Sequence, residues 1–256
     1  MDTANDTVTT TRSKVKGVAD ICFLIDATGS MQPCIDDIKN NIQTFIDTLA
    51  KPDANGGVLL EDWRACVCGY RDFIYESSKG KEPLVMNPFT RDSEVLRRQL
   101  AELKAEGGGD EPESLLDALY AVVNRGKTGR GEAAQEDKWR YASDAARCII
   151  VVTDASFHMN MATEGVAPGA TLDDIVQLLQ QERIRLSIFA PEMECHYMLS
   201  ATDKCTYEAI EIPDPDAPHA AVQALRAFTG DQSNFTKTLE MLAKSVSQSA
   251  AADIEL

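Results

Sequence analysis

A short polar stretch follows directly on an unbroken apolar run near the beginning of the sequence. The run covers residues 21–25 and ends in Asp26, with Thr28 and Ser30 at the next two alternate positions and Gly29 between them. A carboxylate and two hydroxyls on one tight turn are hard oxygen ligands of the kind that Mg²⁺ prefers, although such side chains also satisfy amides in ordinary turns. We expect Asp26, Thr28 and Ser30 to coordinate a divalent cation, Mg²⁺ first, with Mn²⁺ or Ca²⁺ as alternatives.

A second apolar run repeats this arrangement. It covers residues 148–153, and Asp154 follows it. Unbroken apolar runs are typical of strands that are buried on both faces of a parallel sheet, and ligands bind at the carboxyl ends of such strands. If the two strands are neighbours, Asp26 and Asp154 meet at one place. We therefore expect Asp154 to be a further ligand of the same ion, in part through water.

A glycine-rich loop offers a third carboxylate. Residues 107–109 are all glycine and are followed by Asp110, and Pro112 is expected in the first turn of a helix. Asp110 is either a metal ligand or the cap of that helix, with Glu113 completing a capping box. The two roles are compatible, but a carboxylate that is occupied by backbone amides has less to give a cation.

The rest of the sequence alternates between strand and helix patterns. This alternation predicts an α/β fold, a Rossmann-like three-layer sandwich with a mostly parallel central sheet and helices on both faces. The length favours one domain, at residues 18–250, between a disordered leader (1–17) and a short tail (251–256). The expected strands are residues 21–25, 63–70, 84–86, 148–153, 185–190 and 207–212. The expected helices are residues 35–49, 93–103, 112–123, 172–179, 197–201 and 235–246.

The charge balance is strongly acidic. The 256 residues include 25 Lys plus Arg against 41 Asp plus Glu, which gives a formal net charge of −16. Such a charge repels phosphate backbones and anionic lipid surfaces, so we expect neither nucleic acid nor a membrane as a partner. The polar, Thr-rich beginning does not resemble a signal peptide, and no apolar segment approaches the roughly 20 residues that span a bilayer.

The seven cysteines are an odd number, and Cys22 and Cys148 lie inside apolar runs. A thiol there behaves as a small core side chain, which favours a reducing, cytoplasmic location. Cys66 and Cys68 lie two apart on an expected strand and therefore on one face, where packing is the simpler interpretation and a zinc site the alternative. A second zinc candidate is one ligand short and comprises Cys195, His196 and Cys205.

The polar residues that follow the two apolar runs resemble the metal-ion-dependent adhesion site of the von Willebrand factor A family. Asp26, Thr28 and Ser30 resemble its Asp-x-Ser-x-Ser opening, and Asp154 resembles its later aspartate. The resemblance extends to a subgroup with a Gly-Gly-Gly-Asp-x-Pro-Glu loop and covers roughly residues 19–210. Its further motifs are Tyr70-Arg71-Asp72, Asn87-Pro88-Phe89-Thr90, Gly107 to Glu113 and Trp139-Arg140.

The resemblance implies a non-enzymatic binding module, a scaffold or regulator in a multiprotein assembly, whose metal-bearing top face docks a protein. In the family pattern an acidic side chain of the partner completes the cation's coordination, but a basic partner surface would also suit the negative field here. Thr28 replaces the usual serine, and Asp110 is the nearest counterpart of a threonine expected in the glycine-rich loop. If Asp110 is a third anionic ligand, we expect tight metal binding that depends less on an acidic partner.

Two rival functions remain open. One is a metal-dependent hydrolase with Ser30 as nucleophile and His158 as base, although Ser30 would be occupied as a ligand and His158 lacks an evident orienting residue. The other is an assembly protein whose metal site is vestigial. For Asp72, which follows the second expected strand, an ion pair with a nearby base is favoured over a place in the metal crevice. The oligomeric state is not predictable from these patterns.

Overall fold

The computed structural model describes residues 17–50, 60, 62–109, 111–162 and 167–252. Its centre is a six-stranded sheet in the order β3-β2-β1-β4-β5-β6, in which every pairing is parallel except that of β3 with β2. The strands are β1 (Val18–Asp26), β2 (Asp62–Tyr70), β3 (Leu84–Met86), β4 (Ala146–Val152), β5 (Ile184–Pro191) and β6 (Cys205–Ile210). The predicted α/β fold with a mostly parallel sheet is confirmed.

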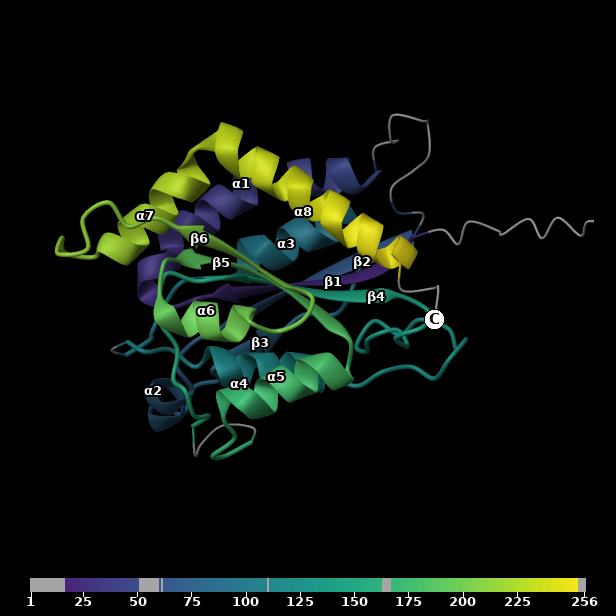
Figure 1. Ribbon diagram of the computed structural model, residues 1–256, viewed down its shortest axis with the longest axis horizontal. Coiled ribbons are helices and arrows are strands. Elements are labelled where there is room, and N and C mark those ends of the chain that lie inside the picture. The colour runs from purple at the N-terminus through teal and green to yellow at the C-terminus, as the bar shows by residue number, and fades with distance from the viewer. Residues whose placement is uncertain (1–16, 51–59, 61, 110, 163–166, 253–256) are drawn as a thin grey trace, which may run out of the picture.

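Helices cover both faces of this sheet (Figure 1). One layer contains α1 (Gln32–Ala50), α3 (Ser93–Glu102), α7 (Ala220–Gly230) and α8 (Gln232–Ala252). The other contains α4 (Leu115–Val123), α5 (Leu172–Gln181) and α6 (Glu194–Ser200), with the short α2 (Phe73–Ser78) near one end of that layer. Two apolar clusters fill the spaces between the layers, one on each face of the sheet.

Alternate residues of β1 supply the two clusters. Ile21, Phe23 and Ile25 pack towards the layer of α1, whereas Cys22 and Leu24 pack towards that of α4. All five side chains are buried, which explains why the run shows no alternation of apolar and polar residues. The unbroken apolar run at residues 21–25 thus indicated a central strand of the sheet.

Two predicted helix starts are confirmed by their caps. The Asp92 carboxylate accepts a hydrogen bond from the amide of Glu94 at 2.8 Å and begins α3. Thr171 and Asp174 form a capping box at the start of α5. Among the described helices, none is long and apolar enough to cross a membrane.

The predicted start of the helix after the glycine-rich loop is wrong. The helix α4 begins at Leu115 with Ser114 as its N-cap, so Pro112 lies before it and Glu113 completes no capping box. The backbone of Glu113 is instead paired with the loop after β4, because its amide donates to the Ser156 carbonyl and its carbonyl accepts from the His158 amide. This pairing holds the segment extended.

Two helices of the structure, α2 and α7, were not predicted from the sequence. The helix α2 has only six residues, and α7 buries only Ala224, Leu225 and Thr229, too few for a recognisable apolar stripe. The predicted closing helix, residues 235–246, lies within α8. The predicted leader and tail fall almost wholly outside the described residues, so the domain boundaries stay a prediction.

The amino end of β1 carries a buried ionic cluster. Asp20 has no solvent exposure, and its carboxylate accepts hydrogen bonds from Arg64 Nε and Arg140 Nε, each at 2.7 Å. Arg64 Nη2 and the Arg140 amide donate to the second Asp20 oxygen at 2.8 and 2.7 Å. This cluster fixes the Trp139-Arg140 motif to the end of the sheet that lies opposite the expected metal site.

Candidate metal centre

The two predicted metal-binding strands are neighbours. In the parallel pairing of β1 with β4, Ile25 lies opposite Val152, so Asp26 and Asp154 follow at the same carboxyl edge of the sheet. The Thr153 hydroxyl donates to Asp26 Oδ2 at 2.7 Å, which ties the two strand ends together. The adjacency that the repeated sequence pattern required is therefore present.

Asp26 lies at the bottom of the candidate centre and has no solvent exposure. Its Oδ1 accepts hydrogen bonds from the Thr28 amide at 2.9 Å and from the Thr28 hydroxyl at 2.7 Å. The Ser30 Oγ lies 3.5 Å from the Thr28 Oγ1. Because the Thr28 hydroxyl donates its proton to Asp26, its oxygen lone pairs remain available to a cation.

Asp154 is buried beside Asp26 and is incompletely satisfied. It is 4% exposed, and its Oδ1 has no hydrogen-bond partner in the part of the chain that the structure describes. Burial raises the pKa of Asp154, while the Ser30 hydroxyl acts in the opposite direction. Burial and the charge of Asp154 raise the pKa of Asp26 to about 7. Two buried carboxylates oppose each other's ionisation unless a positive charge joins them.

Within the described ranges, neither carboxylate forms an ion pair with a basic side chain. The unpartnered oxygen of Asp154, the carboxylate of Asp26 and the hydroxyls of Thr28 and Ser30 are all hard donors. This donor set fits a divalent cation such as Mg²⁺. The structure brings these four predicted residues together, whereas Asp110 lies outside the described residues.

Sequence analysis missed a further carboxylate, that of Glu113. It is 4% exposed, and its Oε2 has no hydrogen-bond partner among the residues described. Burial, followed by the charges of Asp26, Asp72 and Asp154, raises its pKa to about 9. The available signal was the Pro-Glu pair of the glycine-rich motif, which was assigned to helix capping. The pairing of Glu113 with the loop after β4 directs it to the centre instead.

The glycine-rich loop packs directly against the first loop. The Gly29 amide donates to the Gly107 carbonyl at 3.3 Å. Gly108 has a φ of +74°, and a Cβ there would lie 2.8 Å from the Thr28 Cβ. Glycine is therefore required both for the left-handed backbone and for the close approach.

A cavity of about 400 Å³ opens beside the carboxylates. Its polar side is formed by Ser30, Glu111 and Asp154. The other lining residues are mainly apolar and come from the residue before α6, from the segment between β6 and α7 and from the first turn of α7. They comprise Met193, Ile212, Pro215, Ala217, His219, Ala220, Ala221 and Val222.

Asp72 is occupied by structural contacts. Its Oδ1 accepts from the Tyr75 amide at 2.5 Å and caps α2, and its Oδ2 lies 3.4 Å from His158 Nε2. The predicted pairing of Asp72 with a nearby base therefore involves His158. In the described part of the chain, no hydrogen bond joins Ser30 to His158, so the arrangement of a serine nucleophile with its base is not present.

The second zinc candidate does not assemble. Among the described residues, Cys195, His196 and Cys205 do not bring three ligand atoms close enough for one ion. The His196 Nε2 lies 3.1 Å from the Ala155 carbonyl oxygen, and burial lowers the pKa of His196 to about 4. His196 is a neutral core residue that packs between the rings of Phe157 and Tyr207.

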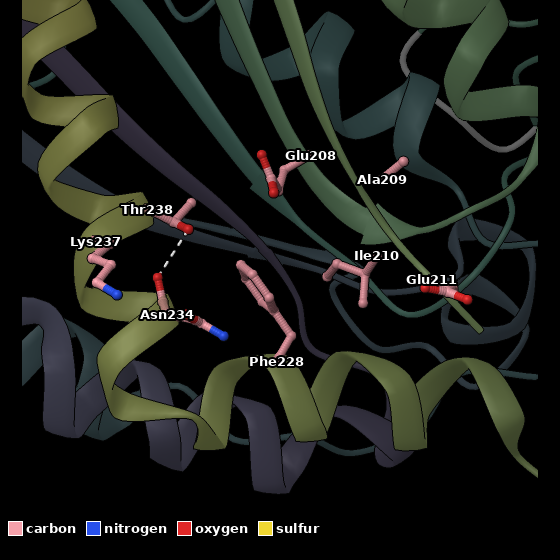
Figure 2. A pocket seen from close by; sticks show the side chains of 8 residues that line it. All are labelled: Glu208, Ala209, Ile210, Glu211, Phe228, Asn234, Lys237 and Thr238. Atoms are coloured by element: carbon pink, nitrogen blue, oxygen red, sulfur yellow. Dashed lines mark hydrogen bonds between the residues drawn. The ribbon is translucent and has the colours of Figure 1, made fainter. Parts of the chain in front are cut away.

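Figure 2 shows a separate hollow of about 420 Å³ between β6, α7 and α8. The Phe228 ring lies at its centre, with Lys237 on one side and Glu208 on another, and the Thr238 hydroxyl donates to the Asn234 carbonyl at 3.0 Å. Its acidic side chains, Glu208 and Glu211, are exposed and point apart. This hollow lacks the convergent oxygens of the metal centre.

The sheet, the two helical layers and the loop at the carboxyl ends of β1 and β4 define a von Willebrand A-type domain. The family model described as "Mediator complex subunit 25 von Willebrand factor type A" matches residues 15–199, which is more than half of the sequence. The chain belongs to this family.

Two relatives extend the comparison. "Alpha-protein kinase vwkA" of Dictyostelium discoideum is 26% identical over 164 residues, which cover 61% of this chain and 23% of that protein. This chain thus spans about a quarter of that relative's length. The solved structure of proximal thread matrix protein 1 from the mussel byssus matches with a TM-score of 0.52 at 11% identity, over 90% of this chain and 47% of that one. At this identity the match shows the fold alone.

Proposed function

We propose that this chain is a non-enzymatic protein-docking module of a multiprotein assembly, and that Mg²⁺ in its top-face crevice is required for docking. The name of its family, that of a complex subunit, supports the assembly role. The observation that carries the metal proposal is the buried pair of Asp26 and Asp154, in which Asp154 Oδ1 has no partner in the described chain. Two buried carboxylates are stable together when a proton or a cation compensates their charge, and this donor set suits a divalent cation.

The proposed ligands are Asp26, Thr28, Ser30 and Asp154, and Asp110 stays a candidate from the sequence. When bound, the cation supplies the positive charge that lets both aspartates ionise. Thr28 and Thr153 orient the Asp26 carboxylate through their hydroxyl groups. Glu113, whose pKa burial raises to about 9, adds a carboxyl group behind this set that is protonated at neutral pH. Mn²⁺ or Ca²⁺ would use the same oxygens.

The proposed partner presents a basic side chain rather than an acidic one. The cavity beside the metal centre has Glu111 and Asp154 on one side and apolar residues such as Ile212 and Val222 on the other. A lysine or arginine fits this lining, because its stem packs on apolar surface while its charged end meets carboxylates. An acidic side chain would meet Glu111 in addition to the net negative charge of the chain.

Calorimetric titration with Mg²⁺ tests the metal step. The unmodified protein should bind one equivalent, Asp154→Asn should bind at least tenfold more weakly, and Asp173→Asn, which changes an exposed aspartate on α5, should bind normally. Equal heats for the protein and Asp154→Asn would refute the proposed ligand set.

The docking step is tested separately, with the same three proteins as bait in native lysate with Mg²⁺ or with a chelator. The unmodified protein and Asp173→Asn should retain partners in the presence of Mg²⁺ but not in the presence of the chelator. Free lysine-rich peptide should release these partners, whereas glutamate-rich peptide should not. Retention of partners that is unchanged by the chelator would favour the alternative of a vestigial metal site.

Metal-dependent turnover of phosphatase or peptidase substrates that is lost in Asp26→Ala would favour the hydrolase. The cytoplasmic location stays a prediction.

A further inference from the structure

Three cysteines converge on the face of the sheet that is covered by α4 and α5. Cys22 of β1 lies opposite Cys66 of β2, and Cys68 follows two positions later on the same face. Their sulfur atoms all lie within 4.8 Å of one another, and those of Cys22 and Cys68 are 3.5 Å apart. Within the described residues, this is the group of three or more His, Cys, Asp or Glu side chains whose ligand atoms are close enough for one ion.

This spacing is that of a three-coordinate metal site. A sulfur ligand lies about 2.3 Å from a metal ion such as zinc, so three sulfurs around one ion lie roughly 4 Å apart. The observed spacing approaches this value without any change of the strands. All three side chains are buried, so water would not compete for the ion.

A positive charge is directed at the sulfur atoms. Arg125 Nη1 donates to the Cys66 sulfur at 3.1 Å, and its guanidinium lies 4.4 Å from the centre of the Phe89 ring. Its other hydrogen bonds are to the carbonyls of Asn87 and Asp137, and in the described chain it forms no ion pair with a carboxylate. The sulfur group is therefore the anionic partner that this guanidinium can stabilise.

The protonation of the thiols agrees with this assignment. Hydrogen bonds from Cys22 and Cys66 hold the pKa of the Cys68 thiol well below its usual value. Burial raises the pKa values of Cys22 and Cys66, so one of these two thiols must release its proton for a metal ion to bind two thiolates, and the other keeps its proton. Among the three thiols, that of Cys68 therefore loses its proton most readily.

We propose that Cys22, Cys66 and Cys68 form a second metal site, separate from the oxygen-lined crevice, which binds a soft monovalent cation of the Cu⁺ type. Thiolates select soft ions, and the group lacks the fourth ligand that a tetrahedral zinc site requires. Arg125 offsets part of the remaining negative charge. With one proton retained by the thiols, the Cu⁺-loaded group and Arg125 are together neutral.

The test is a competition for Cu⁺ between the reduced protein and a chromophoric chelator, and it is carried out in the absence of oxygen. Because the sulfurs are buried, Cu⁺ is added both to the folded protein and during refolding from denaturant. The protein should withdraw one equivalent, and Cys68→Ala should bind at least 100-fold more weakly. Cys148→Ala, which changes a buried strand cysteine on the opposite face, should bind as the unmodified protein does. The proposal would be overturned if the protein withdrew no Cu⁺ by both routes, or if Cys68→Ala bound Cu⁺ as tightly as the unmodified protein.

Arg125→Gln provides a second test, because it leaves all three sulfurs and the packed core in place. We expect about tenfold weaker Cu⁺ binding, with an unchanged circular dichroism spectrum and unchanged Mg²⁺ binding. Cu⁺ affinity that ignores this substitution would remove Arg125 from the site. Cu⁺ binding that is lost in Asp26→Asn would also overturn the proposal, since it would place the ion in the oxygen-lined crevice.

Discussion

The two ends of β1 each bury an aspartate, but the protein treats them differently. At the amino end, Asp20 is surrounded by the guanidinium groups of Arg64 and Arg140. At the carboxyl end, the donors to Asp26 among the described residues are hydroxyl and amide groups, and Asp26 lies beside a second carboxylate, Asp154. Both aspartates at the ends of β1 are equally inaccessible to solvent.

The difference teaches where the compensating charge comes from. A buried carboxylate is costly unless an opposite charge accompanies it. At Asp20 the chain supplies that charge, so the amino end is complete by itself. At Asp26 and Asp154 the described chain supplies none, and the proposed function assigns that role to a cation from solution. One end is structural, and the other is the candidate binding site.

The largest expected effect is at the amino end. Arg140→Met leaves Asp20 with one guanidinium, and we expect the free energy of unfolding to fall by about 3 kcal/mol because a buried charge loses a partner. Urea denaturation measures this loss. Arg91→Met is the matched control, since Arg91 forms an exposed ion pair with Asp62 and should cost less than about 1 kcal/mol. Equal losses in the two variants would contradict a special role of the buried cluster.

The second prediction concerns the carboxyl end. Asp26→Asn should weaken Mg²⁺ binding about 100-fold, or about 2.7 kcal/mol, because a charged ligand is lost. The metal-free variant should be at least as stable as the unmodified protein at pH 8, because repulsion with Asp154 is removed. Calorimetry and urea denaturation measure the two effects. A metal-free variant that is several kcal/mol less stable would show that Asp26 resembles Asp20 after all.

The third prediction is a dependence of stability on pH. The folded pKa of Asp26, about 7, lies above its ordinary value of 3.8, so between these values the folded state binds more protons than the unfolded state. The stability of the metal-free protein should therefore fall as pH rises through this window, by about 2 kcal/mol between pH 5 and 7 relative to Asp26→Asn. Saturating Mg²⁺ should abolish the difference, since the cation replaces the proton. A difference that grows in the opposite direction would refute this assignment.

The smallest expected effect tests the contact between the two loops at the metal end. Gly108→Ala should lower the free energy of unfolding by about 1–2 kcal/mol and weaken Mg²⁺ binding severalfold, because the new methyl group displaces Thr28. Gly169→Ala is the control, since its φ is +77° but nothing lies within 4 Å of the added carbon. It should show the backbone cost with normal Mg²⁺ binding. Matching affinities in both variants would contradict the role of this contact.

Sequence patterns were sufficient where the signal is local. The two apolar runs that end in Asp26 and Asp154 predicted both the fold and the meeting of these residues, because buried parallel strands have a distinctive composition. Patterns failed where the structure depends on contacts between distant segments. Glu113 reaches the candidate metal centre through pairing with the loop after β4, and Arg125 contacts Cys66 across 59 positions of sequence. Such contacts leave no periodicity in the sequence.

The last part of the described chain lies beyond residues 15–199, the range that the family model matches. Yet β6 extends the sheet, Phe228 stacks on Phe189, and α8 packs on α1, β1 and β4. Ile212 and Val222 form one wall of the crevice. The range that defines the family is thus smaller than the unit that folds. A fragment ending at residue 199 would expose the apolar edge of the sheet at β5 and would lack one wall of the crevice. We expect such a fragment to aggregate rather than to bind a partner.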